Sequence, residues 1–85
     1  MKYRIVFLPV AQKEILSLPH EVRKRIDRKI LALVDDPRPH DGKALHGGKG
    51  LYRVRVGDYR IVYRVEDKII TVVIVRVRHR KDVYR

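Results

Sequence analysis

Residues 51–65 constrain the fold most, because their side chains alternate with period two on both sides of Gly57 and Asp58. Such alternation around a two-residue turn indicates a β-hairpin, and glycine at the first turn position favours a type II′ turn. This register predicts four cross-strand pairs: Val56 with Tyr59, Arg55 with Arg60, Val54 with Ile61, and Tyr52 with Tyr63. One face of the hairpin is then apolar and aromatic, and the other carries four arginines: Arg53, Arg55, Arg60 and Arg64.

The arginine face of this hairpin places Arg55 directly opposite Arg60. Like charges in that position destabilise a sheet by roughly 0.2–1 kcal/mol per pair, so the arrangement favours an anion bound over the arginines. A guanidinium cluster can bind a phosphate through paired hydrogen bonds and stabilise charge in a phosphoryl transition state, and tyrosines can stack unpaired bases. The pattern therefore predicts RNA binding, with or without phosphodiester cleavage. An acidic protein is the other partner that such a face would attract.

Size and charge limit the classes of protein that this chain can represent. Its 85 residues form one small domain. Cysteine is absent, which excludes a disulfide framework or a thiolate metal site and fits a reducing cytoplasm. There is no apolar run of about 18 residues, as an ordinary membrane-spanning helix requires. The net charge of +11 predicts a polyanionic partner, and a lipid surface is disfavoured because the basic pattern lies on strands.

Two helices are predicted between a first strand, residues 3–8, and the hairpin. Pro9 suits the first turn of a helix, and residues at spacings of four and three give that helix one apolar stripe: Ala11, Ile15 and Leu18. After Pro19 a second helix over residues 20–36 has its own stripe: Val22, Ile26, Ile30 and Leu33. Residues 36–50 form a loop rich in glycine and proline.

The last strand, residues 68–78, has an apolar half without alternation, which is typical of a central strand buried on both faces. We therefore predict an α+β fold for a small single domain. It has a four-stranded, mainly antiparallel twisted sheet with an N-terminal helix pair packed on one face, in the order β-α-α-β-β-β.

The connection into the last strand decides where its arginines point. A connection of three residues, 66–68, pairs Val65 with Ile69 and puts even-numbered positions from 70 to 80 on the arginine face. The basic surface then gains three residues: Arg76, Arg78 and Arg80. A connection of even length would bury these cations under the helices, which is prohibitively unfavourable without partners. We therefore expect the connection of odd length.

The histidines show no spacing typical of metal ligands, and we expect neither a metal nor a cofactor. His20 and His40 are expected at the surface. His79 lies between Arg78 and Arg80 on the basic strand, where a histidine can exchange protons near neutral pH. A surface histidine without a chemical role is the alternative.

Three features together resemble one known family: the two helices joined by Leu18-Pro19, the motif Leu45-x-Gly47 before the hairpin, and the hairpin with its Gly57-Asp58-Tyr59-Arg60 segment. In these features the chain resembles the RelE/ParE superfamily of toxin–antitoxin toxins. The resemblance covers nearly the whole chain and identifies residues 1–85 as a single RelE-like toxin domain. The ending, residues 77–85, is similar to the RelE branch in particular.

This resemblance implies the toxin of a type II toxin–antitoxin module. RelE toxins are mRNA interferases that cleave mRNA on the 70S ribosome and inhibit translation. The implied chemistry is metal-independent attack of a 2′-OH group on the adjacent phosphate, which gives a 2′,3′-cyclic phosphate. The implied partners are mRNA, ribosomal RNA and an acidic RelB-like antitoxin. We expect a cytoplasmic protein that is a monomer without its antitoxin.

The resemblance also implies roles for particular residues. Arg53 and Arg55 match two basic residues that flank a hydrophobic residue on the family's second strand. Arg60 would hold the scissile phosphate, Arg80 would assist the leaving 5′-oxygen, and Tyr84 would orient or stack the substrate. A flanking set is expected to bind the RNA backbone: Arg64, Arg76, Arg78 and Lys81.

One departure from the family pattern affects the mechanism. The family has lysines where this chain has Arg53 and Arg55, and arginine cannot usefully act as a base. His79, ribosomal RNA and water are the remaining candidates for the general base. Two other functions stay open at this point: a ParE-like toxin that inhibits DNA gyrase, and a basic RNA-binding domain without catalysis.

Overall fold

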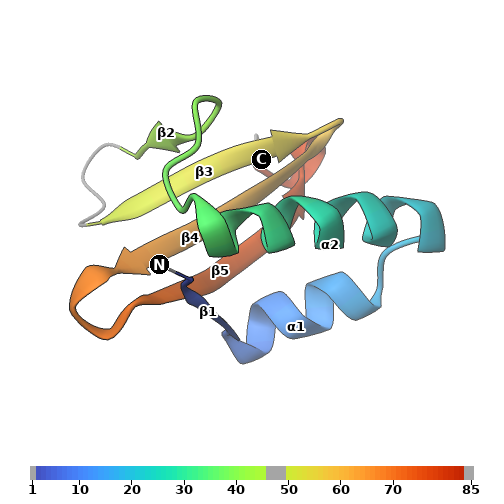
Figure 1. Cartoon of the computed structure of the whole chain (residues 1–85). Coiled ribbons are helices and arrows are strands. Elements are labelled where there is room, and N and C mark those ends of the chain that lie inside the picture. Colours follow the sequence, from blue (N-terminus) through green and yellow to red (C-terminus); the bar gives the residue numbers. More distant parts are fainter. Residues whose placement is uncertain (1, 46–49, 84–85) are drawn as a thin grey trace.

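The computed structural model describes residues 2–45 and 50–83 (Figure 1). The elements follow one another as β1 (Arg4–Phe7), α1 (Pro9–Leu16), α2 (His20–Asp35), β2 (Lys43–Ala44), β3 (Leu51–Val56), β4 (Tyr59–Glu66), the 3₁₀ helix η1 (Asp67–Ile69), β5 (Thr71–His79) and α3 (Arg80–Val83). Among the described residues, no helix is long and apolar enough to cross a membrane.

The described strands form one sheet in the order β1-β5-β4-β3-β2. β1 runs parallel to β5, and the other pairs are antiparallel. The predicted α+β class is confirmed, with α1 and α2 on the same side of the sheet (Figure 1). The predicted number of four strands is too low by one, because β2 lies inside the expected loop. Its two residues pair with β3, and an element that short has no periodicity to read.

The β3–β4 hairpin has the predicted register. Its cross-strand pairs include the four expected ones: Val56 with Tyr59, Arg55 with Arg60, Val54 with Ile61, and Tyr52 with Tyr63. Gly57 has a φ of 59°, the positive value that a type II′ turn requires at its first position. The turn therefore fixes which residues of β3 and β4 share a face.

The predicted connection into the last strand is wrong. Residues 67–70 make the connection, four residues rather than three, so that Val65 pairs with Val72 and not with Ile69. The predicted placement of position 72 on the arginine face is therefore also wrong, because Val72 is fully buried in the core. Ile74 is fully buried in the same way.

A β-bulge returns the arginines of β5 to the predicted face. Tyr63 pairs with Ile74, whereas the preceding Val62 pairs with Arg76, so that Val75 is an extra residue on β5. One extra residue exchanges the two faces of a strand beyond that point. Arg78 consequently pairs with Arg60, and the even connection does not bury it.

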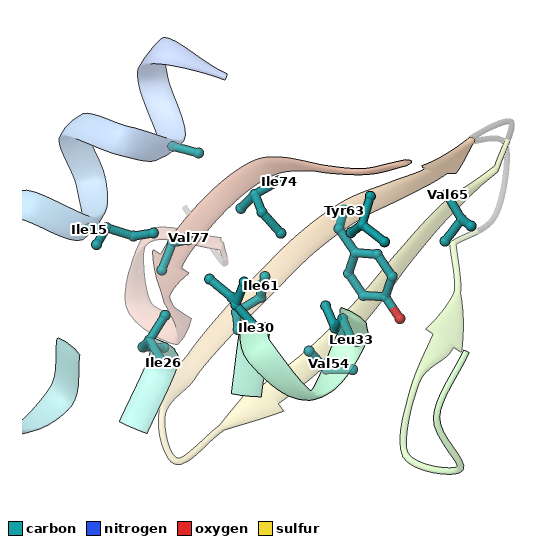
Figure 2. Close-up of a cluster of buried hydrophobic side chains, with 12 residues drawn as sticks. Ile15, Ile26, Ile30, Leu33, Val54, Ile61, Tyr63, Val65, Ile74 and Val77 are labelled. Carbon is teal, nitrogen blue, oxygen red and sulfur yellow. The ribbon is translucent and has the colours of Figure 1, made fainter. Parts of the chain in front are cut away.

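The core lies between the sheet and the two helices. Buried side chains from both helix stripes contribute to it, as predicted: Ala11, Ile15, Ile26, Ile30 and Leu33. The strands supply the facing layer, shown in Figure 2: Val54, Ile61, Tyr63, Val65, Ile74 and Val77. The polar face of α2 and the sheet face opposite the helices do not contribute to this core and are available for binding.

A hydrogen-bonded cluster fixes the segment that follows α2. The buried Tyr63 hydroxyl donates to the carbonyl of Pro37 at 2.9 Å. Arg38 donates to both carboxylate oxygens of Asp67 and to the hydroxyl of Tyr52. The Arg38 guanidinium holds the pKa of the Asp67 carboxyl below its usual range. These contacts tie the loop after α2 to the far end of the hairpin.

Candidate functional site

Three arginines stand in direct register on the sheet face opposite the helices. Arg55 on β3 pairs with Arg60 on β4, which in turn pairs with Arg78 on β5. Neighbouring strands lie about 4.8 Å apart, so the three side chains leave the sheet within roughly 10 Å of one another. This row concentrates positive charge across the middle of the sheet.

A cleft of about 190 Å³ opens at the end of this row. Its lining comes from the hairpin turn, the strand ends beside it and the start of α3: Arg55, Gly57, Asp58, Tyr59, Arg60 and Arg80. Two of the three row arginines therefore reach the cleft, and Arg80 joins them from the C-terminal segment.

Arg80 reaches the cleft because its backbone is attached to the hairpin turn. Its N–H group donates to the carbonyl oxygen of Asp58 at 2.7 Å. The Arg80 Nη1 atom lies 3.8 Å from the Asp58 Oδ1 atom, and both side chains are about two-thirds exposed. The sequence predicted Arg80 as a continuation of the strand face, whereas it is the first residue of α3. The turn, rather than the strand, brings it to the other arginines.

Arg55 and Arg60 have no ion-pair partner among the residues that the structure describes. Asp58 supplies the one carboxylate in the lining of the cleft, and its ion pair is with Arg80. Arg53 lies on the same face, two residues before Arg55 on β3, where it pairs with Val62. It is not part of the cleft lining. The cleft is therefore a strongly cationic hollow suited to a phosphate.

Two arginines of the predicted RNA-binding set are held by carboxylates of the protein itself. The Arg64 Nε atom lies 2.5 Å from a Glu66 oxygen. Arg76 donates through Nε and Nη2 to Glu14, with the shorter distance 2.9 Å, and this contact raises the pKa of Arg76. RNA binding by either arginine would have to compete with these ion pairs, whereas Lys81 is exposed.

His79 lies on the other side of the sheet from Arg60 and Arg78, because it pairs with Tyr59. Its ring meets the Tyr59 ring edge-on, with 5.0 Å between centroids. Its Nδ1 atom accepts the N–H group of Lys81 at 3.1 Å. The backbone of α3 therefore occupies this ring nitrogen in the present arrangement.

The remaining predicted site residue, Tyr84, lies outside the described residues. Sequence reasoning missed Asp58 as part of the cleft and Glu14 as the partner of Arg76. Asp58 could have been found, because its turn position places it beside Arg55 and Arg60. Nothing in the sequence links Glu14 to Arg76, which lies 62 residues further along the chain.

Known toxins resemble this chain over nearly its whole length. The family described as ParE toxin of type II toxin-antitoxin system, parDE, matches residues 5–84. Toxin RelG of Mycobacterium tuberculosis is 33% identical over 86 residues, which cover 100% of this chain and 99% of RelG. The mRNA interferase toxin RelE of Escherichia coli strain K12 is 32% identical over 88 residues, covering 99% of this chain and 92% of that toxin.

The fold has solved relatives as well. The archaeal RelE-RelB complex from Pyrococcus horikoshii OT3 contains a chain that matches with a TM-score of 0.83 at 32% identity, covering 94% of this chain and 97% of that chain. Sequence and structure thus agree over almost the full length. The chain belongs to the RelE/ParE superfamily and is a RelE-like toxin of a type II toxin–antitoxin system.

Proposed function

We propose that this toxin is a metal-independent endoribonuclease that cleaves mRNA on the ribosome and thereby inhibits translation in the cytoplasm. The observation that carries the proposal is the cleft that joins Arg55, Arg60 and Arg80. The E. coli relative, named an mRNA interferase, supports the same activity.

The cleft provides charge where the proposed reaction develops it. A ribose 2′-oxygen attacks the adjacent phosphorus, the bond to the 5′-oxygen breaks, and a 2′,3′-cyclic phosphate is left. Arg60, at the centre of the arginine row, holds the non-bridging oxygens of the phosphate. Arg80 stabilises the leaving 5′-oxygen from its position beside the turn, and Tyr84 orients the substrate. Positioned cations of this kind act on the transition state more than on the ground state.

The group that removes the proton from the 2′-OH group is not one of these arginines. Arg53 and Arg55 stay protonated at any physiological pH, so their contribution is electrostatic. His79 faces away from Arg60 and its Nδ1 atom already accepts a hydrogen bond. We therefore assign the base to ribosomal RNA or water in the assembled decoding site.

The proposed partner that controls the toxin is an acidic RelB-like antitoxin. A related archaeal toxin was solved as a RelE-RelB complex. The net charge of +11 would accelerate association with an acidic chain through long-range attraction. Cleavage stops when the antitoxin covers the arginine row or keeps the toxin off the ribosome.

The double variant Arg60→Ala with Arg80→Ala tests the assigned site. We expect loss of growth inhibition and of mRNA cleavage, because removing one such electrostatic group lowers a rate by about 10²–10³. Antitoxin binding should be largely retained. Primer extension on mRNA from translating ribosomes measures the cleavage. A matched variant, Lys13→Ala with Lys24→Ala, removes two exposed charges from the helices and should cleave normally; undiminished cleavage by the Arg60/Arg80 variant contradicts the site.

A ParE-like gyrase inhibitor is the second candidate, because the matching family is described as ParE toxin. The two functions differ in target, so a DNA supercoiling assay with gyrase separates them. We expect supercoiling to continue at toxin concentrations that stop translation. Inhibited supercoiling together with intact mRNA would replace the ribonuclease proposal. A binding domain without catalysis would leave both mRNA and supercoiling intact.

A further inference from the structure

A second basic hollow, of about 450 Å³, lies between α2 and the β3–β4 hairpin. α2 supplies Arg25, Arg28, Lys29 and Ala32 to its lining, and the hairpin supplies Arg55, Val56 and Gly57. We refer to this hollow as the α2 groove. Arg55 and Gly57 line the cleft as well, so the groove and the cleft meet at the hairpin turn.

The α2 groove presents unneutralised charge. Arg25 and Arg28 are exposed and have no ion-pair partner among the described residues. Lys29 differs, because its Nζ atom lies 2.6 Å from Asp41. The long cationic side chains of Arg25 and Arg28 thus line the same groove as Arg55. No carboxylate is part of the groove lining.

Gly57 lets one of these cations approach the turn closely. A Cβ atom at this position would lie only 3.1 Å from the Arg25 Nη2 atom. The guanidinium of Arg25 therefore lies against the backbone of the same turn that forms one wall of the cleft. A chain leaving the cleft across Gly57 would meet Arg25 first and Arg28 one helical turn further.

We propose that the α2 groove is a second RNA subsite, which holds backbone phosphates of the nucleotides next to the scissile phosphate. The proposal rests on the ribonuclease function and adds the path that the substrate strand takes. Arg25 and Arg28 bind successive phosphates by charge-assisted hydrogen bonds, which carry no sequence information and fix the register of the strand.

The lining favours RNA over an acidic protein partner. Its apolar members are Ala32 and Val56, and Ala32 is too small to form a pocket for a large side chain. Hot spots of protein interfaces are enriched in tryptophan and tyrosine as well as arginine, and this lining contains no aromatic residue. A phosphate backbone needs chiefly cations and donors. The groove supplies the second kind of contact.

The double variant Arg25→Gln with Arg28→Gln tests the subsite. The probe is a fluorescent single-stranded RNA of roughly ten nucleotides, compared with a dinucleotide. For the longer RNA, loss of two phosphate contacts should flatten the plot of log affinity against log salt by roughly 1.4. Dinucleotide binding should be unchanged, since the cleft is intact. On translating ribosomes KM should rise while kcat is kept.

A charge-matched control comes from the same helix. Arg23→Gln with Lys24→Gln removes two cations outside the lining of the α2 groove, and it should change the salt slope far less. Equal slopes for the two double variants, or absence of RNA binding by the unmodified toxin, would overturn the proposal. Loss of affinity for an acidic antitoxin with RNA binding intact would also overturn it, in favour of a protein-binding groove.

The proposed function and this subsite fail in different ways. If the Arg60/Arg80 variant still cleaves mRNA, the assigned cleavage site is wrong. If that variant is inactive and the Arg25/Arg28 variant behaves like its control, the cleavage site stands and the α2 groove has no part in RNA binding.

Discussion

Tyr63 offers the most quantitative test of how the sheet is held together. Its side chain is fully buried in the core, as Figure 2 shows, and its hydroxyl donates to the carbonyl of Pro37. Replacing Tyr63 with Phe keeps the ring and its stacking on Tyr52, at 5.8 Å between centroids. The substitution leaves the Pro37 carbonyl without this donor, which costs about 1–2 kcal/mol. At neutral pH the variant should therefore unfold at lower urea concentration.

Alkaline pH should reverse this difference. Burial raises the pKa of Tyr63 from 10.0 to about 12, so the unfolded chain loses this proton first. The stabilisation is complete below pH 10 and is lost as the pH rises towards 12. A pKa difference of this size corresponds to about 2.7 kcal/mol at most. Phenylalanine has no proton to lose, so the advantage of the native protein should fall to zero near pH 11.

Urea unfolding followed by circular dichroism at several pH values between 7 and 12 measures both effects. Tyr59→Phe is a suitable control, because the Tyr59 ring lines the cleft and its hydroxyl has no hydrogen bond among the described contacts. That variant should keep the alkaline loss of stability. A gap between native protein and Tyr63→Phe that stays constant up to pH 12 would refute the reasoning.

Two further predictions concern ion pairs. Glu14→Ala removes the acceptor of the Val77 N–H group and the partner of Arg76. We expect urea unfolding to show about 1–2 kcal/mol lower stability, and fluorescence anisotropy to show tighter binding of single-stranded RNA by the released Arg76. Glu14→Gln keeps an acceptor and should lose less stability. Arg38 lowers the pKa of Asp67, so the Asp67 carboxylate stabilises the fold at pH values above its pKa in the unfolded chain. This stabilisation is lost as the pH falls through the lower pKa of the folded state. Asp67→Asn should therefore make the decrease in Tm below pH 4 less steep. An equally steep fall in the variant would exclude Asp67 as the cause.

The sequence was sufficient where a pattern repeats over several turns or pairs. Alternation over residues 51–65 predicted the hairpin and its register, because a two-residue turn leaves one way to pair the strands. The spacing of Ile26, Ile30 and Leu33 predicted the buried side of α2 for a similar reason. In both cases a local period determines which side chains face the core.

The register of β5 could not be predicted in the same way. Its residues from Val72 to Val75 are all apolar, so either face of this stretch could point to the core. Connection length and bulge each shift the faces by one residue, and their effects cancel at Arg76 and Arg78. The prediction of a basic face was therefore correct through an incorrect pairing. Burying the arginines would be costly, and this cost favours any register that keeps them on the open face of the sheet. The sequence did not show whether an odd connection or an even connection with a bulge would produce that register.

The composition of the cleft bears on whether the proposed cleavage needs the ribosome. Arg55, Arg60 and Arg80 can neutralise a phosphate and the charge that develops on it, but none of them can remove a proton. The facing pair Arg55 and Arg60 also opposes folding by roughly 0.2–1 kcal/mol, and an anion bound over the two side chains would offset that cost. In the proposed mechanism the toxin thus supplies the cations but not the general base. If the base is ribosomal RNA, free RNA should bind to the cleft and remain intact, because the missing group is then present only on the ribosome.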